Sequence, residues 1–516
     1  MDYGAVYRLR RYQSQIVSYD RRRFTSVVRF EKCIGIQVSF LSLYIYIYIL
    51  TIQSTNTTQH THRDFVYRSL FTSSKGHDAR VARVAKVVSD RHKLPKGDPD
   101  RKPMCTARAP WQNLSTRFSE YKKNSTQVFV GDFRNILSLD TKNNVVHIEP
   151  LVEVGQITRW LIPRGYMLAT TLEIDEATVG GLSMAVGMTT ASHQYGLLQE
   201  TVVEYEMVMG DGKILKVTKD SAPDLFYTLP WSHGSLGFLV GLKLRVIPVK
   251  PYVKLRYTVC KTQKGYSKLI RQLAHLTGSY CPDFVEATVF SRDQAVVMDA
   301  SYVRNSLSLS LFLQQQQQQQ QISHRFAKGP PNGAKTNNLT AWYKPWFYKH
   351  IESMLAMPDR SEVIEYIDTY TYIFRHNRAI FWTLRDQLDE RIGNHWLFRL
   401  LLGWLLPPKV TFLKLPTTPD LKEEMAYRRV YQDIVLPIRT IEEAVDKAGK
   451  LFEIWPILIY PSRIYDHSGE GYRGIFRTPD KKDIVKGNST FSLTQSLSLS
   501  LPLSLSLSLS LSRKNI

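Results

Sequence analysis

One stretch of the chain combines glycines with small and apolar residues in a pattern that suits phosphate binding. It runs from Leu172 to Gly196 as LEIDEATVGGLSMAVGMTTASHQYG, with further glycines at Gly180, Gly181 and Gly187. Glycine allows positive φ, so that backbone N–H groups can point together at an anion, and its missing side chain permits close approach of a pyrophosphate. No G-x-G-x-x-G is present here, so this is not the Rossmann fingerprint. A Gly-Gly pair alone is more often a turn, and the surrounding sequence must decide.

Four blocks follow one another in order along the chain: CTARAPW (105–111), VVHIEPLVEVGQ (145–156), TVGGL with the residues that follow it (178–196), and DLFYTLPWSHGSLGFLVGLKLRVIP (224–248). These blocks resemble the flavin domain of the delta(24)-sterol reductases, the Diminuto and seladin-like family within the vanillyl-alcohol-oxidase superfamily. The resemblance continues in a second region through WYKPWFYKH (342–350), 375–382, FRLLLGWLLPPK (398–409), QDIVLP (432–437) and WPILIYP (455–461).

The resemblance implies an FAD-dependent oxidoreductase that uses NADPH to reduce the delta-24 side-chain double bond of a sterol. No histidine stands in the block at 105–111, so the flavin is expected to be held noncovalently. A second dinucleotide fingerprint is not found, and the NADPH site cannot be located from the sequence. The expected cofactor-binding residues are Thr178, Val179, Gly180, Gly181, Leu182, Ser183, Met184, Ala185, Val186, Gly187, Met188, Thr189, Thr190 and His193.

Reduction of an unpolarised alkene needs an acid that donates a proton while the flavin delivers hydride. The candidates are His376 and Tyr372, which lie in a matched block of the second region, and His193 competes with them. The alternative is that His376 pairs with a carboxylate and that Arg375 or Arg378 lies on a solvated surface.

An aromatic group in the second region is a candidate for a flat, apolar sterol slot, although such clusters are more often plain core. The sequence also departs from the family pattern at two positions. Ala185 replaces a usual glycine in the loop, which would crowd the pyrophosphate, and Phe374 replaces a usual histidine. The aromatic candidates are Trp342, Tyr343, Trp346 and Phe347.

The elements expected to position these residues are those of an α+β fold. A PCMH-type FAD-binding domain is expected over 60–250 and an α+β substrate (cap) domain over 251–485, incomplete at its C-terminal end. Hydrophobic periodicity predicts helices over 78–91 and 396–406. Strands are predicted at 127–130, 145–148, 202–209 and, after a Gly-Asp-Gly turn, 214–217.

The composition excludes several other classes of protein. With 516 residues, 43% hydrophobic and 22% charged, the chain is long enough for two or three domains with ordinary cores. Its net charge of +22 comes from scattered Lys and Arg and not from one motif, so nucleic-acid binding is not expected. None of the four cysteines stands in a C-x-x-C pair, which favours a reducing compartment and predicts no metal site.

The two ends of the chain differ from the rest. A basic segment at 1–32 precedes an uncharged run at 33–53, which is long enough to cross a bilayer once. The expectation is a single-pass anchor in the endoplasmic reticulum membrane with a cytosolic catalytic part. The YIYIYI repeat in this run is also typical of translated repetitive DNA. The glutamine-rich tract within 306–325 and the Ser/Leu tail at 486–516 are expected to lie outside the fold.

Two alternatives remain open at this point. The first is a flavin oxidase or dehydrogenase of the same fold that acts on another substrate, because fold alone does not fix substrate. The second is a truncated or non-catalytic relative that binds flavin or sterol, or a chain misread from its gene. The sequence does not indicate an oligomeric state.

Overall fold

The computed structural model describes residues 74–108, 120–303, 334–386, 388–405, 429–452, 455–465, 484–485 and 489–500. The basic segment at 1–32, the expected anchor at 33–53 and the low-complexity tract at 306–325 lie outside these residues. Within the described ranges, no helix is both long enough and apolar enough to cross a membrane.

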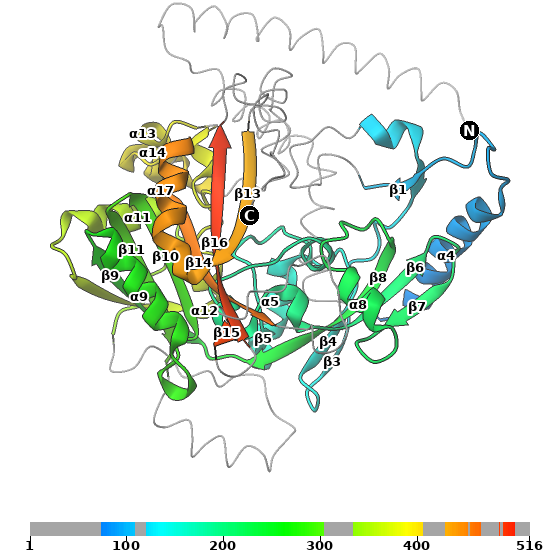
Figure 1. The fold of residues 1–516 in the computed structure, drawn as a ribbon, viewed down its shortest axis with the longest axis horizontal. Coiled ribbons are helices and arrows are strands. Elements are labelled where there is room, and N and C mark those ends of the chain that lie inside the picture. Colours follow the sequence, from blue (N-terminus) through cyan, green and yellow to red (C-terminus); the bar gives the residue numbers. More distant parts are fainter. Residues whose placement is uncertain are drawn as a thin grey trace, which may run out of the picture. The chain divides into compact units, whose positions relative to one another are not determined.

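The first large sheet is antiparallel and has six strands in the described part of the chain. Its path runs β3-β4-β8-β6-β7, with β5 paired to β8 (Figure 1). The predicted strands at 145–148, 202–209 and 214–217 are confirmed as β4, β6 and β7. The six strands are β3 (Ile136–Asp140), β4 (Val145–Ile148), β5 (Tyr166–Leu168), β6 (Val202–Met209), β7 (Ile214–Val217) and β8 (Gly237–Pro248).

Helix α4 (His77–Lys93) confirms the helix predicted at 78–91 and packs against this sheet. Its buried residues Val81, Val84 and Val88 recur at helical spacing and share a core with Val208 of β6. A separate pair of parallel strands, β1 (Met104–Thr106) and β2 (Thr126–Val128), precedes the sheet in sequence. Four more short helices follow within this part: α5 (Val154–Leu161), α6 (Val179–Met184), α7 (Ser192–Tyr195) and α8 (Pro223–Thr228).

A second antiparallel sheet begins four residues after β8 ends, and it has eight strands in the described residues. Its path runs β12-β9-β11-β10-β14-β16-β13, and β15 pairs with β16. The strands are β9 (Tyr252–Cys260), β10 (Phe284–Ser291), β11 (Gln294–Tyr302), β12 (Glu362–Asp368), β13 (Arg429–Pro437), β14 (Ile457–Tyr465), β15 (Ile484–Val485) and β16 (Ser489–Ser500). The described part of the chain therefore contains helices, two large antiparallel sheets and one parallel pair of strands, while the domain bounds 60–250 and 251–485 stay predictions.

The two faces of the second sheet have different partners. Helices α9 (Gln263–His275) and α17 (Ile441–Phe452) contact each other and share a core with Val285 and Ala287 of β10 (Figure 1). Phe284 belongs to the other core, which also contains residues of the first sheet. Because side chains alternate along a strand, Glu286 and Thr288 share the face of Phe284. The face of β10 that bears Phe284 therefore places the polar side chains of Glu286 and Thr288 toward the core shared with the first sheet.

The Ser/Leu tail differs from the expectation that it lies outside the fold. Residues 489–500 form β16, which hydrogen-bonds along its length to β13 on one side and to β14 on the other. Alternation of a polar and an apolar residue has the two-residue period of a β-strand, so the sequence is compatible with a position inside a sheet. The prediction is wrong for these residues.

The remaining helices lie in the second part of the chain. The helix predicted at 396–406 is present as α14, which continues as a 3₁₀ turn at 403–405. Helix α12 precedes the matched block around residue 375, and helix α13 follows it. The four helices are α11 (Phe347–Ser353), α12 (Thr369–Ile373), α13 (Glu390–Gly393) and α14 (Trp396–Leu402).

Candidate functional site

The predicted flavin loop begins with α6, which lies against the segment after β4. The backbone N–H groups of Val179 and Gly180 donate to the carbonyls of Val152 and Pro150, at 2.9 and 2.8 Å. A Cβ at position 180 would lie 2.4 Å from Pro150 Cβ, so only glycine permits this approach. The first glycine therefore serves contact between two segments of the chain.

The second half of the loop is held by the residues just after α7. The N–H of Leu198 donates to the Gly187 carbonyl at 2.8 Å, and the Gln199 amide donates to the carbonyl of Ala185. A Cβ on Gly187 would lie 2.7 Å from Leu198 Cβ, so this glycine also permits a close contact. The loop is thus fixed at both ends before any ligand binds.

The groups that remain in the loop fit an anionic ligand. The backbone N–H groups of Gly181 and Val186 donate to no residue in the described ranges, and Gly181 is exposed. No acidic residue occurs between Thr178 and Thr190, so nothing in this stretch would repel a phosphate. The residues present therefore fit the pyrophosphate of FAD, held by backbone N–H groups. Crowding by Ala185 stays a prediction.

The end of the loop joins the second sheet through His193 and Thr190. The N–H of Val285 on β10 donates to the Thr190 carbonyl at 2.8 Å. The His193 ring places Nδ1 3.0 Å from the Thr190 carbonyl and Nε2 2.8 Å from the Pro282 carbonyl. Burial lowers the pKa of His193 to about 4, so the neutral ring donates to one of the two carbonyls. His193 links the loop to the sheet and has no nitrogen left for a flavin.

A buried group of charged side chains lies beside this junction. Arg375 donates from Nε and Nη2 to Glu286 Oε1 at 3.0 and 2.5 Å, and both side chains are at most 1% exposed. Burial, the largest single cause, would raise the pKa of Glu286, but the charge of Arg375 and the contacts with Arg375 and His376 together outweigh burial and hold the pKa at about 2. Glu286 is therefore a fixed carboxylate.

Glu173 is a second acid of this group and has the opposite protonation state. Its Oε1 accepts from the Thr190 N–H at 3.4 Å, and its buried Oε2 has no partner among the described residues. Burial raises the pKa of Glu173 to about 8, although Arg375 acts against this shift. At neutral pH Glu173 thus carries a proton, at the end of the loop that fits a flavin.

The predicted catalytic residues Tyr372 and His376 lie in the same group. Burial raises the pKa of Tyr372 well above its usual value, so the phenol keeps its proton. Burial lowers the pKa of His376, and its Nε2 lies 3.2 Å from Glu286 Oε2. The alternative that His376 pairs with a carboxylate is confirmed. The alternative of a solvated surface is wrong for Arg375 and Arg378, which are 1% and 2% exposed.

The predicted aromatic slot is divided in the structure. Trp346 and Phe347 are buried, and the Phe347 ring lies edge-on to the His376 ring at 4.8 Å between centroids. Trp342 and Tyr343 are 39% and 51% exposed. Two of the four aromatic residues are therefore buried and two are exposed, and their contact with a sterol stays a prediction.

Sequence reasoning missed Glu173 and Glu286. Glu286 stands in FVEATVF, where one carboxylate interrupts an otherwise apolar strand, and such an interruption is a usable signal. Glu173 lies five residues before the flavin loop and resembles any loop acid, because burial decided by distant strands is not visible locally.

Comparison with known proteins bears on the same residues. The model of an FAD binding domain family matches residues 103–218, which include the whole loop. Delta(24)-sterol reductases of Pisum sativum, Homo sapiens and Arabidopsis thaliana are 35%, 34% and 33% identical, over 77%, 77% and 78% of this chain. The chain spans 66%, 70% and 68% of their respective lengths. A solved chitooligosaccharide oxidase superposes with a TM-score of 0.46 at 12% identity, covering 82% of this chain and 75% of its own.

These relatives exceed 30% identity, and more than two thirds of the human and Arabidopsis proteins is covered. The matched region contains the flavin loop, the junction at Thr190 and the buried group around Glu173 and Arg375. The chain therefore belongs to the delta(24)-sterol reductase family and is an FAD-dependent oxidoreductase.

Proposed function

We propose that this protein reduces the delta-24 side-chain double bond of a sterol such as desmosterol, with noncovalent FAD and with NADPH as the reductant. The names of the relatives support the substrate class. The structural observation that carries the proposal is the position of a protonated, buried acid, Glu173, at the end of the flavin loop.

The loop supplies the site for the cofactor. The free N–H groups of Gly181 and Val186 would hold its phosphates, and Gln199 keeps the loop in the conformation that presents them. When bound, FAD would supply the hydride for one carbon of the double bond, with NADPH as its reductant.

The proton for the other carbon comes from Glu173. Its Oε2 holds the acidic proton away from the bond to Thr190, so that transfer breaks only the O–H bond while a new C–H bond forms. Hydride and proton together convert the alkene to the saturated chain. Arg375 favours the carboxylate that remains, and a proton from solvent restores the acid.

The two residues chosen from sequence fit other roles in this scheme. His376 is neutral and faces Glu286, and a neutral imidazole is a weak acid. Tyr372 keeps its proton, but its high pKa makes it a weaker donor than Glu173. We propose that His376 and Tyr372 position the buried acids Glu173 and Glu286. After Glu173, Tyr372 is the next candidate for the proton donor.

The test is an assay of the purified full chain in detergent. A flavin absorption spectrum, release of FAD by heat, and conversion of desmosterol to the saturated sterol with equimolar NADPH oxidation would support the proposal. Bound flavin with oxygen consumption on an alcohol or lactone, and no saturated sterol, would favour an oxidase of the same fold. A folded protein that takes up no FAD would contradict both.

The location of the protein is part of the same proposal. We propose that residues 33–53 anchor it once in the endoplasmic reticulum membrane and leave the flavin site in the cytosol, where NADPH is available. Protease treatment of sealed microsomes tests this orientation. Digestion of an epitope placed after residue 465 without detergent is expected, and protection of that epitope would reverse the orientation.

A further inference from the structure

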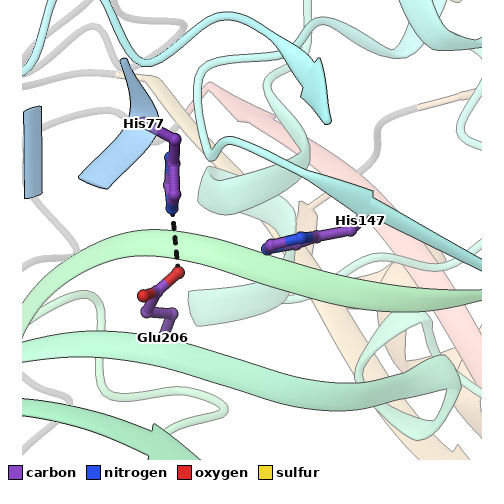
Figure 2. A group of neighbouring side chains, drawn as sticks. All are labelled: His77, His147 and Glu206. Atoms are coloured by element: carbon purple, nitrogen blue, oxygen red, sulfur yellow. Dashed lines mark hydrogen bonds and ion pairs between the residues drawn. The ribbon is translucent and has the colours of Figure 1, made fainter. Parts of the chain in front are cut away.

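Three side chains that no step above uses converge between helix α4 and the first sheet. They are His77 from the first turn of α4, His147 from β4 and Glu206 from β6 (Figure 2). One ligand atom of each lies within 4.8 Å of the other two. His77 Nε2 is 2.9 Å from Glu206 Oε2.

A glycine makes the convergence possible. Strand β8 lies between β4 and β6, and its Gly241 pairs with Glu206. A Cβ at this position would lie 2.6 Å from Glu206 Oε2 and 3.4 Å from His147 Nε2. The Glu206 carboxylate and His147 Nε2 therefore both lie over Gly241. The side chain of any other residue at position 241 would fill this space.

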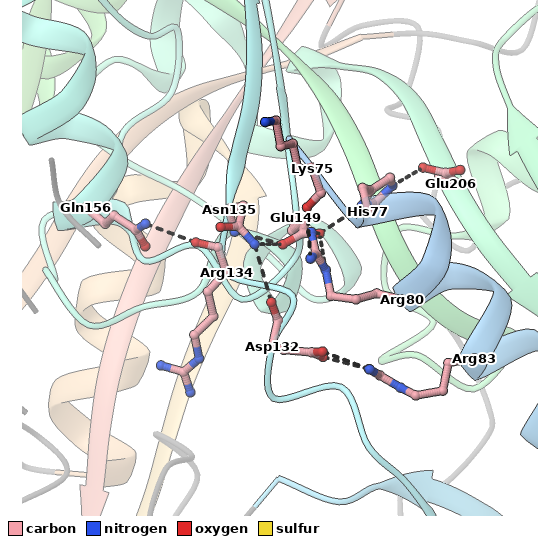
Figure 3. A network of polar contacts seen from close by, with 10 residues as sticks. All are labelled: Lys75, His77, Arg80, Arg83, Asp132, Arg134, Asn135, Glu149, Gln156 and Glu206. Atoms are coloured by element: carbon pink, nitrogen blue, oxygen red, sulfur yellow. Dashed lines mark hydrogen bonds and ion pairs between the residues drawn. The ribbon is translucent and has the colours of Figure 1, made fainter. Parts of the chain in front are cut away.

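The orientation of His77 is fixed from its other side. Its Nδ1 lies 2.8 Å from Glu149 Oε1, so the ring turns Nε2 toward Glu206 (Figure 3). Glu149 is held in turn by Arg80, with Nη2 at 2.6 Å, and by the Asn135 N–H at 2.8 Å. A carboxylate that accepts a hydrogen bond from the far nitrogen of a histidine is the usual support for a metal-binding imidazole.

His147 is the open member of the group. Its ring makes no hydrogen bond to any residue that the structure describes, and it is partly exposed, whereas the side chains of His77 and Glu206 are 9% and 7% exposed. Solvent can therefore reach the group from the side of His147, and in the Nδ1–H tautomer of its neutral ring Nε2 offers a lone pair.

We propose that His77 Nε2, His147 Nε2 and Glu206 Oε2 bind one Zn²⁺, with water in the fourth position. Two imidazole nitrogens and one carboxylate oxygen are a donor set that zinc takes, at bond lengths of about 2.0 to 2.2 Å. Tetrahedral geometry then separates ligand atoms by roughly 3.4 Å, so the widest pair has to close by roughly 1.4 Å at most. Rotation of the unbonded His147 ring supplies this movement.

The ion would replace the proton that His77 Nε2 donates to Glu206 Oε2. His77 would keep its Nδ1–H for Glu149 and give its Nε2 lone pair to the metal. Since His77 begins α4 and the other two ligands belong to the sheet, the ion would tie the first described helix to the sheet of the flavin domain. The sequence predicted no metal site because its ligands stand 70 and 59 positions apart along the chain, counting from His77 to His147 and from there to Glu206.

The test is a measurement of Zn²⁺ binding to the full chain after removal of metals with a chelator. Competition with a chromophoric chelator gives stoichiometry and affinity, and neither depends on flavin or activity. We expect one tightly bound Zn²⁺ per chain and a Tm that rises with Zn²⁺. In His147→Gln the affinity should fall at least about tenfold and the rise in Tm should disappear.

A matched control is His92→Gln, since His92 is an exposed histidine at the other end of the same helix. This variant should bind Zn²⁺ as the unchanged protein does. Glu206→Gln keeps an oxygen for His77 but removes the charge, and it should also lose affinity for Zn²⁺. Absence of Zn²⁺ binding, or equal binding by His147→Gln and the unchanged protein, would overturn the proposal and leave only a hydrogen bond from His77 to Glu206.

Discussion

Glu173 keeps its proton at neutral pH because burial raises its pKa. Its contribution to proton transfer can therefore be measured by replacing the acid with an amide. Glu173→Gln keeps the size of the side chain and an oxygen for the Thr190 N–H, but an amide cannot act as the acid. We expect turnover of desmosterol to fall by about 10² to 10⁴. Rapid mixing should show that NADPH still reduces the bound flavin at an unchanged rate, and only reoxidation by the sterol should slow.

Loss of both half-reactions in Glu173→Gln, or loss of flavin, would instead mean that the residue supports the fold. Tyr372→Phe separates the two proton donors. If Glu173 is the acid, Tyr372→Phe reduces sterol turnover less than Glu173→Gln does.

Stability should depend on pH through the same residue. In the unfolded chain Glu173 ionises near pH 4.5, whereas in the folded protein it keeps its proton up to about pH 8. Between these values the folded state binds more protons, so its free energy of unfolding falls as the pH rises, by up to about 1.4 kcal/mol per pH unit. Urea denaturation at a series of pH values in this range should show that the free energy of unfolding changes less with pH in Glu173→Gln than in the unchanged protein. The same pH dependence in both proteins would contradict a protonated Glu173.

The pair of Glu286 and Arg375 should behave differently, because both charges are buried. Glu286→Gln leaves the guanidinium without its counterion and should cost about 3 to 5 kcal/mol of unfolding free energy. Asp132→Asn is the control, since its partner Arg83 is 42% exposed and the loss should be about 0 to 1 kcal/mol. Equal losses in the two variants, measured by urea denaturation, would contradict a larger contribution of the buried pair to stability.

At the scale of elements, helix α6 makes a prediction about cofactor affinity. Gly180→Ala places a methyl group 2.4 Å from Pro150 Cβ, so the helix must move away from the segment after β4. Gly181→Ala meets only Thr178 Oγ1, at 3.0 Å. We expect FAD to dissociate more readily from Gly180→Ala than from Gly181→Ala, as seen in flavin fluorescence during dilution, and the reverse order would show that the second glycine makes the closer contact.

The elements also show where sequence reasoning succeeds. The predicted strands at 145–148, 202–209 and 214–217 and the helix over 78–91 were found because alternation and helical spacing are local signals. The role of β16 was missed because low complexity argued against a place in a sheet, while pairing to β13 and β14 depends on strands distant in sequence.

At the scale of the whole molecule, sequence motifs located the flavin loop and the block that contains Tyr372 and His376. They could not show that these segments meet Glu173 and Glu286. That meeting depends on the alternation of β10 and on the bond from Val285 to the end of the loop. The domain bounds, the membrane anchor and the flavin contacts of individual loop residues stay predictions.

The strand β16 has a consequence for the length of the chain. Its Ser-Leu unit has two residues, as has the repeat of a β-strand, and repetitive DNA gains and loses such units when it is copied. The repeat lies at Ser496–Ser500, which pairs with Arg429–Asp433 of β13, and a shift by one unit there brings the same residue types opposite β13. Alleles that differ in the number of Ser-Leu units should therefore keep this strand paired with β13.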